Sequence, residues 1–316
     1  MSLPFPPQIK TDRHVWHAFQ YHSRTFSLAA RLLPRPVRRP IATLYLFCRT
    51  VDSIADDRVL EIGPDRALDE LKTLQDHLDA TLDGCPPDAF MWQRLHQIHE
   101  RFGLYTAPFY ELIDGAVWDL EGRPVESRQD LIAYSNLVGG SIGAMVLPFL
   151  LQDRADLPRT EPAARSLGIA MQITNIVRDV GEDLRRLDRI YLPRTWLATY
   201  GLTPQDLCRP TPPEPYSLLM ERVMEAAEGL FREGMTGIEM LPARMKTSIR
   251  TAARTYREIL NEVRARGYDN FNHRAFVPFR RKCLRMVYDG YERRKARLRL
   301  ASGAVPEANL ATDFGF

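Results

Sequence analysis

Apolar residues recur along most of this chain at steps of three and four, the spacing that places them on one face of an α-helix. Runs in which apolar and polar residues alternate are nearly absent, and so are Asn-Gly hairpin turns. The stretch 130–151 is typical, and its apolar positions at helical spacing are Leu131, Tyr134, Val138, Ile142, Met145 and Phe149. This pattern predicts an all-α protein.

Clusters of glycine and proline divide the apolar pattern into roughly eight to ten predicted helices. The breaks fall at residues 33–36, 63–64, 84–87, 122–124, 157–158 and 209–215. No linker is long or polar enough to separate domains, and no repeat recurs at a fixed period. The glycines at 139, 140 and 143 lack the GxGxxG order of a nucleotide-binding loop, so we expect them to allow close helix packing or the approach of a ligand. We therefore expect one helical domain.

The composition of the chain excludes several function classes. Its 316 residues are 45% hydrophobic and 26% charged, which is enough apolar sequence to bury a large core. The formal net charge of +3 is too small for the basic field of a general nucleic-acid binder. The four cysteines, at 48, 85, 208 and 283, form no CxxC pair, so we expect a reducing, cytoplasmic setting. We expect neither a signal peptide nor a membrane span.

Two acidic stretches carry the candidate chemistry, and the first is LYLFCRTVDSIADD, residues 44–57. If this stretch is helical, Asp52 and Asp56 lie one turn apart on one face, with Arg49 one turn before them. Like charges at this spacing repel each other, and burial strengthens the repulsion, so we expect a compensating partner. A solvated edge of a surface helix is the other interpretation, and this stretch alone does not decide between them.

The second acidic stretch is MQITNIVRDVGEDLRRLDRIYLP, residues 171–193. Asn175, Asp179 and Asp183 follow one another at steps of four, and Arg178 lies beside them. Carboxylates bind Mg²⁺, and guanidinium groups hold phosphate oxygens bidentately. Neither line of oxygen-bearing side chains, Asp52 and Asp56 or Asn175, Asp179 and Asp183, includes a thiolate or an imidazole, which argues against zinc. Two such stretches favour a site for divalent cations and a diphosphate, with a salt-bridged surface helix as the alternative.

These motifs resemble those of the squalene and phytoene synthases, which join two prenyl diphosphates head to head, and they are most similar to the bacterial phytoene synthases. The resemblance covers about residues 21–291 in six ordered segments: YHSRTFSLAARLLP, YLFCRTVDSIAD, LIDGAVWDL, DLIAYSNLVGGSIGAM, QITNIVRDVGEDLRRLDRIYLP and AARTYREILNEVRARGYDNFNHRAFVPFRRK. It implies an all-α, single-domain, isoprenoid-synthase-like helical bundle around a central cavity. Residues 1–20 would then be an N-terminal extension, and residues 292–316 a basic helix end and tail.

The resemblance also implies roles for individual residues. The expected ligands of Mg²⁺, with Mn²⁺ as a substitute, are Asp52, Asp56, Asn175, Asp179 and Asp183. The residues expected to contact the diphosphates are His22, Arg24, Arg49, Arg178, Tyr256, Arg274 and Lys282. Tyr134 and Gln172 are expected to line the reacting centre, and Tyr134 and Arg178 are counted with the four aspartates as catalytic.

Two positions depart from the pattern of the family. Arg24 stands where many relatives have Lys, and a planar fork contacts phosphate differently from a point charge. Asp57 extends the first acidic stretch by one residue. On an α-helix it lies about 100° further around than Asp56, so we expect it outside the metal-binding group.

The resemblance implies a Mg²⁺-dependent prenyltransferase that condenses two geranylgeranyl diphosphates, through a cyclopropylcarbinyl diphosphate, to phytoene in carotenoid biosynthesis. NADPH is not expected for that reaction. A squalene or dehydrosqualene synthase that uses two farnesyl diphosphates is the first alternative, because sequence alone does not locate the side chains that close the far end of the cavity. A relative that hydrolyses the cyclopropyl intermediate and a non-catalytic helical scaffold are more remote; Arg178 weighs against the former and the four aspartates against the latter.

The expected partners are the prenyl diphosphate substrates and no nucleic acid. The basic run ERRKARLRL, residues 292–300, is typical of a solvated helix end, and peripheral contact with an anionic membrane is its other interpretation. The oligomeric state stays open, with a monomer among the options.

Overall fold

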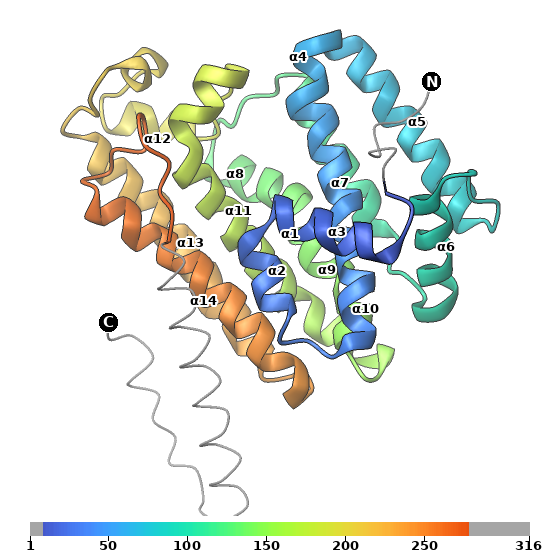
Figure 1. Ribbon diagram of the computed structural model, residues 1–316. Helices are drawn as coiled ribbons and strands as arrows, with labels where there is room; N and C mark the ends of the chain where they lie inside the picture. Colours follow the sequence, from blue (N-terminus) through green and yellow to red (C-terminus); the bar gives the residue numbers. More distant parts are fainter. Residues whose placement is uncertain (1–8, 278–316) are drawn as a thin grey trace, which may run out of the picture. The chain divides into compact units, whose positions relative to one another are not determined.

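The computed structural model describes residues 9–277, and every regular element in that range is helical (Figure 1). The longer helices are α1 (Asp12–His22), α3 (Arg35–Ser53), α5 (Pro64–Leu82), α6 (Phe90–Phe102), α7 (Ala107–Leu120), α11 (Leu157–Leu187), α13 (Tyr216–Ile238) and α14 (Ala243–Ala265). The shorter ones are α2 (Arg24–Ala30), α4 (Val59–Ile62), α8 (Arg128–Ser135), α9 (Ser141–Met145), α10 (Leu147–Leu150) and α12 (Arg194–Thr199). The predicted all-α class is confirmed.

Four turns of other helix types interrupt this series. They are the π-helical turns η1 (Ile54–Arg58) and η2 (Asn136–Gly140) and the 3₁₀ turns η3 (Arg154–Asp156) and η4 (Pro204–Cys208). The predicted breaks all lie between elements or at a helix start, but the described chain holds more helices than predicted. The stretch 130–151, expected as a single helix, is divided because η2 inserts a wider turn between α8 and α9.

Local interactions fix the two ends of the segments that carry the site. A capping box begins α8, since Ser127 and Asp130 each accept a backbone N–H of the other, at 3.3 and 2.8 Å. Pro158 lies in the first turn of α11, where its missing N–H costs no hydrogen bond. Asp188 ends α11 in the left-handed conformation, with φ 53°, and turns the chain back. Residues 171–187 of the second acidic stretch therefore lie on one helix of 31 residues, and residues 188–193 follow its end.

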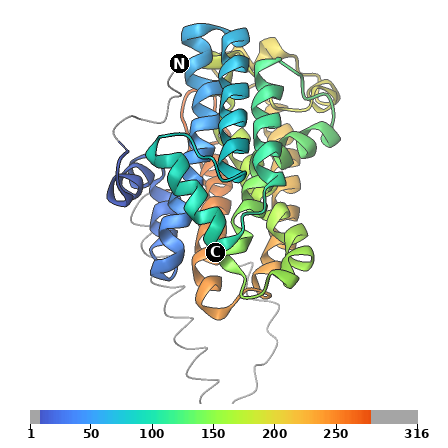
Figure 2. The ribbon, with the colours of Figure 1, turned by 90° about the vertical axis from the view of Figure 1, so that its right-hand side faces the viewer.

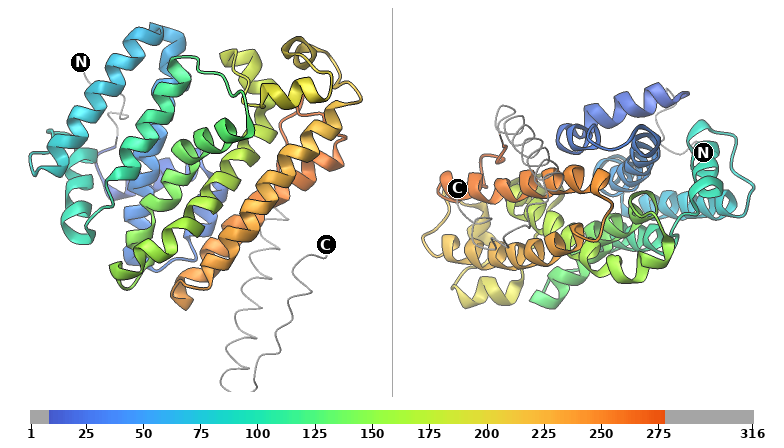
Figure 3. Two further views of the ribbon diagram at one scale, coloured as in Figure 1. Left: turned by 180° about the vertical axis from the view of Figure 1, so that it is seen from behind. Right: turned by 90° about the horizontal axis from the view of Figure 1, so that it is seen from below.

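Helix α11 is central to the arrangement. It packs against α13 and α14 on one side and against α8, η2 and α9 on the other, as the view from behind shows (Figure 3). Helices α3, α5, α6 and α7 form a neighbouring group (Figure 2). Helices α1 and α2 pack on α3 and α14. The two acidic stretches thus belong to two different helix groups.

The core consists of two buried apolar clusters. The first lies among the helices of the amino-terminal half and includes Phe47, Trp92 and Phe109. The second surrounds α11, α13 and α14 and includes Tyr216 and Phe231. Val138, in η2, packs against both clusters. A residue of the π-helical turn therefore stands at the junction of the two.

Glycines bring η2 and α9 unusually close to α11. A Cβ atom added to Gly139 would lie 2.4 Å from the carbonyl oxygen of Gly168, and one added to Gly168 would lie 2.1 Å from that of Gly139. A Cβ atom at Gly143 would lie 2.2 Å from the carbonyl oxygen of Ala164. Two helices meet backbone to backbone here, which only residues without a side chain permit. These glycines therefore allow the close helix packing that was expected.

One helical stretch, Arg128–Leu150, has the length and composition of a membrane span, with a mean hydropathy of 1.4 over its most apolar window. Core helices of folded domains often meet the same criterion, so the finding is weak evidence for a span. In this protein 44% of that window is buried, and η2 and α9 pack on α11.

Replacing Gly168 with alanine tests the close contact. We expect Gly168→Ala to lower the free energy of unfolding by about 1–3 kcal/mol, because the new methyl group forces the two backbones apart. The matched control is Gly229→Ala in α13, where the added Cβ atom meets only the end of Arg232 at 3.8 Å. Alanine there should stabilise the helix by about 0.5–1 kcal/mol. Urea unfolding followed by circular dichroism measures both changes, and equal stability of the two variants would contradict the contact.

Candidate active site

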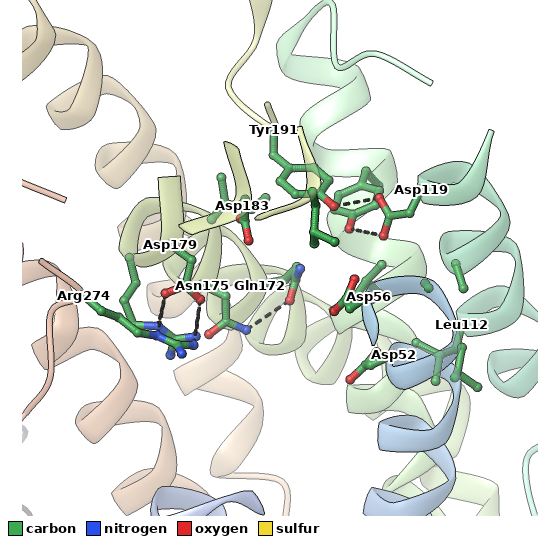
Figure 4. Close-up of a pocket in the computed structure, with 18 residues that line it drawn as sticks. Asp52, Asp56, Leu112, Asp119, Gln172, Asn175, Asp179, Asp183, Tyr191 and Arg274 are labelled. Carbon is green, nitrogen blue, oxygen red and sulfur yellow. Dashed lines mark hydrogen bonds and ion pairs between the residues drawn. The ribbon is translucent and has the colours of Figure 1, made fainter. Parts of the chain in front are cut away.

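A cavity lies where the two helix groups meet, and the elements around it are those that carry the acidic stretches. Its lining residues are Val51, Asp52, Ala55, Asp56, Leu112, Ala116, Asp119, Tyr134, Val138, Gln172, Asn175, Ile176, Arg178, Asp179, Asp183, Leu187, Tyr191 and Arg274. In the close-up, Asp52 and Asp56 face the cavity from the α3 side, and Gln172, Asn175, Asp179 and Asp183 face it from α11 (Figure 4). The tertiary structure therefore brings the two predicted acidic groups to one cavity.

The wall formed by α11 presents a line of oxygen atoms. Gln172, Asn175, Asp179 and Asp183 follow at steps of three, four and four, which keeps them on one helix face. The amide nitrogen of Asn175 donates to Oε1 of Gln172 at 3.1 Å. The amide oxygen of Asn175 is buried without a hydrogen-bond partner. A buried acceptor in this state is costly, so this oxygen is poised to bind a cation or a donor group.

Two arginines hold the carboxylate of Asp179. Arg178 donates from Nε to Oδ1 at 2.7 Å and from Nη2 to Oδ2 at 2.6 Å. Arg274 contacts the same two oxygens, from Nε at 2.8 Å and from Nη2 at 3.0 Å. A carboxylate offers about four lone-pair positions, so these contacts use all of them. Any further ligand of Asp179 must displace an arginine, and Arg274, at 38% side-chain exposure against 15% for Arg178, is the freer of the two.

A glycine explains how Arg274 reaches α11. A Cβ atom at Gly181 would lie 2.1 Å from the carbonyl oxygen of Phe271, so only glycine lets this segment lie against the helix. The N–H of Gly181 donates to the carbonyl oxygen of Asn270 at 3.2 Å, and the side chain of Asn270 donates to the carbonyl oxygen of Val177 at 2.6 Å. These contacts fix the register that puts Arg274 opposite Asp179.

The opposite wall joins α3 to the π-helical turn η1. Asp52 lies in the last turn of α3, and Asp56 lies in η1, where π geometry replaces the α-helical spacing assumed from the sequence. Arg189 donates to Oδ1 of Asp56 and to the carbonyl oxygen of Ala55, both at 2.9 Å. Arg189 follows directly after the left-handed residue Asp188, so the turn that ends α11 brings a cation across to the first acidic stretch. Both π-helical turns thus contribute residues to the cavity wall.

Burial raises the pKa values of four carboxyl groups at the cavity, those of Asp52, Asp56, Asp119 and Asp183. It raises the pKa of Asp52 to about 7, and the neighbouring carboxylate of Asp56 adds to the effect. Burial, followed by the nearby carboxylates of Asp179 and Asp56, raises the pKa of Asp183 to about 8. Burial also raises the pKa of Asp56, although Arg189 opposes the change. The site therefore holds negative charge at a cost, and cations relieve that cost.

Asp57 does not line the cavity. Its carboxylate accepts from Nη2 of Arg49 at 3.1 Å and also pairs with Arg186, near the end of α11. Asp57 thus joins the end of α3 to the end of α11 by an ion pair on each side. Arg49, a residue expected to contact a diphosphate, is therefore held in an ion pair with Asp57.

Sequence reasoning missed two partners of Tyr134 at the cavity, Asp119 and Tyr191. The carboxylate of Asp119, at the end of α7, accepts a hydrogen bond from Tyr134 at 2.9 Å and another from Tyr191 at 2.8 Å. The two phenol rings stack, with centroids 4.8 Å apart and planes 20° apart. Arg189 lies 3.8 Å from Asp119. Burial raises the pKa of Asp119 to about 6, while Arg189 and the phenols oppose the shift.

One signal in the sequence pointed to this cluster. Leu112, Ala116 and Asp119 follow at steps of four and three, so an acid ends an apolar helix face within the segment LIDGAVWDL. An acid on such a face is expected to be buried and partnered. Tyr191 and Arg189 carry no comparable signal, because they lie beyond the end of α11, where no helical spacing applies.

Several predicted site residues do not line the cavity. His22 and Arg24 are exposed near the junction of α1 and α2, and Arg49 is half-buried in its pair with Asp57. Tyr256 is buried in α14, where it stacks on Phe26 with ring centroids 4.9 Å apart. These residues surround the site without reaching its surface. Lys282 and the basic run 292–300 lie outside the described residues.

The donor groups suit a hard divalent cation better than a soft one. The walls offer carboxylate and amide oxygens, and within residues 9–277 no group of three or more His, Cys, Asp or Glu side chains is gathered closely enough to hold a metal by itself. Mg²⁺ is usually held by one or two carboxylates together with phosphate oxygens of a substrate. The residues present therefore fit Mg²⁺ that arrives with a phosphate ligand, and the unpartnered oxygen of Asn175 supports this fit.

The chain is similar in sequence and in fold to several known proteins. The sequence profile of the squalene/phytoene synthase family matches residues 19–281. The chain is 35% identical to a phytoene synthase of Cereibacter sphaeroides over 266 residues, which is 82% of this chain and 74% of that protein. It is 36% identical to a phytoene synthase of Rhodobacter capsulatus over 263 residues, 82% of this chain and 75% of that protein. A crystal structure of a dehydrosqualene synthase in complex with ligand matches with a TM-score of 0.80 and 29% identity, over 90% of this chain and 96% of that one.

The raised pKa of Asp183 predicts how stability depends on pH. Between about pH 4 and 8 the unfolded chain has an ionised Asp183 while the folded chain keeps it protonated, so the free energy of unfolding falls as pH rises through this window. Asn does not titrate. We expect Asp183→Asn to match the unaltered chain at about pH 4 and to exceed it at pH 9, in EDTA, by about 1–3 kcal/mol in the free energy of unfolding.

The control for this measurement is Asp206→Asn. Hydrogen bonds from Thr203 lower the pKa of Asp206, so its charge stabilises the folded chain above about pH 4. This variant should therefore lose stability at pH 9. If Asp183→Asn also loses stability there, the assigned burial of Asp183 is wrong.

Proposed function

The chain belongs to the squalene/phytoene synthase family, and from this premise we propose that it joins two geranylgeranyl diphosphates head to head to form phytoene. The reaction passes through a cyclopropylcarbinyl diphosphate and belongs to carotenoid biosynthesis. One observation carries the proposal: carboxylates from α3, η1 and α11 converge, with arginines beside them, on one cavity that also has apolar walls. Relatives named phytoene synthase, in purple bacteria and plants, support the C20 substrate.

Oxygen ligands on both walls would hold Mg²⁺, with Mn²⁺ as a substitute. They are Asp52, Asp56, Asn175, Asp179 and Asp183. When bound, the cation supplies Lewis-acid chemistry that makes a diphosphate a better leaving group. The raised pKa values of Asp52 and Asp183 mean that these carboxyl groups ionise more readily once positive charge is present.

The arginines of the site bind the diphosphates. Arg178 and Arg274 line the cavity, and each presents the fork of donors that matches phosphate oxygens. The carboxylate of Asp179 already accepts hydrogen bonds from both arginines. A diphosphate that draws Arg274 away therefore leaves the oxygens of Asp179 available to bind a cation. Diphosphate and cation binding are therefore coupled at this carboxylate. The family resemblance assigns further diphosphate contacts to His22, Arg24, Arg49, Tyr256 and Lys282, of which Lys282 lies outside the described residues.

The inner walls protect a carbocation from water. Val51, Leu112, Ala116, Val138 and Ile176 line them, and none offers a nucleophile. The ring of Tyr134, with 2% exposure, presents a negative π face that stabilises positive charge. The charged groups thus serve ionisation of the diphosphate, and the apolar walls then protect the carbocation that ionisation produces.

The size of the cavity favours one alternative. It encloses about 220 Å³, below the range of about 300–1,000 Å³ that is usual for ligand pockets, so prenyl chains must displace side chains at its walls. Shorter chains need less displacement, and the matched dehydrosqualene synthase structure points the same way. Condensation of two farnesyl diphosphates is therefore the second candidate. A non-catalytic scaffold is opposed by the four aspartates at the cavity.

Product analysis tests the proposed function. The purified full chain is incubated with Mg²⁺ and either farnesyl or geranylgeranyl diphosphate, with and without NADPH, and the products are identified by mass. We expect a C40 hydrocarbon with a central triene, formed without NADPH and abolished by excess EDTA. Exclusive formation of C30 product would replace the proposal with the alternative, and absence of a condensation product from both substrates would overturn both.

Removal of one carboxylate tests the cation-binding role. We expect Asp52→Asn to lower kcat/KM by about 10²–10³-fold, because it removes a charged ligand of the cation that would stabilise the departing diphosphate. Helical content measured by circular dichroism should not change. The matched control is Asp76→Asn, which alters an exposed aspartate of α5 and should leave kcat/KM unchanged. Near-normal turnover of Asp52→Asn would remove Asp52 from the cation site.

A further inference from the structure

We propose that Asp119 and Tyr191 are positioning residues that fix the phenol of Tyr134 at the reacting centre; this inference rests on the proposed function. The motif that identified Tyr134 does not include either partner. Both line the same cavity as Tyr134. Asp119 accepts a hydrogen bond from the Tyr134 hydroxyl, and the ring of Tyr191 stacks on the ring of Tyr134. Figure 4 shows Asp119 and Tyr191 side by side at the cavity, joined by a hydrogen bond.

The hydrogen bonds leave Tyr134 little freedom. Its hydroxyl donates to Oδ2 of Asp119 at 2.9 Å, and Oδ1 of the same carboxylate accepts from Tyr191 at 2.8 Å. The stacked ring of Tyr191 covers one face of Tyr134, and Trp118 approaches it with centroids 5.9 Å apart. The carboxylate of Asp119 therefore fixes the position of the Tyr134 hydroxyl, and stacking on Tyr191 fixes the orientation of the Tyr134 ring.

Charge is balanced within the same cluster. The side chain of Asp119 is 10% exposed, and an anion so buried needs a cation or strong donors nearby. The two phenols supply the donors, and Arg189, at 3.8 Å, supplies positive charge while it also holds Asp56. Arg189 and Tyr191 come from the short segment after Asp188, so the turn that ends α11 delivers two of the three partners of Asp119.

The arrangement changes the electronic character of Tyr134. A phenol that donates its hydrogen to a carboxylate carries more negative charge on its oxygen and ring than a phenol bonded to a neutral group. Such a ring stabilises a neighbouring carbocation more strongly. Asp119 thereby acts on the reaction through Tyr134, and its loss should lower kcat while it leaves KM nearly unchanged.

A double-mutant cycle tests this assignment. Asp119→Asn keeps the shape of the side chain and removes its charge, and we expect it to lower kcat by about 10- to 100-fold, the loss typical of a hydrogen bond to a charged group. KM should change by less than about 3-fold. In a Tyr134→Phe background the hydrogen bond is already absent, so Asp119→Asn should then lower kcat by less than about 3-fold. Tyr191→Phe keeps the stacking, removes one donor and should lower kcat by about 3- to 10-fold.

The control is a second phenol–carboxylate pair outside the cavity. Tyr110 donates to Asp79 at 2.5 Å between α7 and α5, and Asp79→Asn should leave kcat unchanged. If the unaltered chain is active and Asp119→Asn lowers kcat equally with Tyr134 and with Phe at position 134, the assignment is wrong. A comparable loss from Asp79→Asn would also overturn it, because general destabilisation would then explain the effect. Absence of any condensation product from the unaltered chain would instead overturn the proposed function, and the assignment with it.

Discussion

Negative charge gathered in a poorly solvated interior is the constraint on which the rest of this structure depends. Five carboxyl groups face the cavity, and burial disfavours the ionised form of most of them. Leaving a buried charge without a partner typically costs several kcal/mol, so the fold must place cations opposite these acids. Arg189 does so for Asp56, and Arg178 with Arg274 does so for Asp179. The pairs of Arg189 with Asp56 and of Arg274 with Asp179 join segments that are distant in the chain.

Backbone geometry makes those ion pairs attainable. The contact of Gly139 with Gly168 sets the distance between η2 and α11, and Gly181 admits the backbone of Phe271 beside the same helix. The π-helical turns then change the direction of side chains at both walls without ending the helical segments. Small residues and irregular turns thus occur where the site requires two backbone segments to lie close together. Regular helices supply most of the buried apolar side chains of the core.

The same charge pattern connects folding with the proposed chemistry. Acids and arginines that neutralise one another can exchange partners when a diphosphate and a divalent cation arrive together, because each guanidinium prefers phosphate geometry and each carboxylate can bind the metal. The full occupancy of Asp179 by two arginines makes this exchange a requirement at that residue. Beyond the charged rim, the apolar wall and Tyr134 offer the surroundings that a carbocation needs.

Helical periodicity and glycine or proline signals are local, so the sequence predicted most of the helices, their breaks and the two lines of oxygen-bearing side chains. It also carried the resemblance that led to the family. The sequence did not predict which arginine meets which acid, that Arg49 pairs with Asp57, or that Asp119 and Tyr191 belong to the site. Contacts between helices depend on packing and on the direction of turns such as that at Asp188, and no spacing along one helix encodes them.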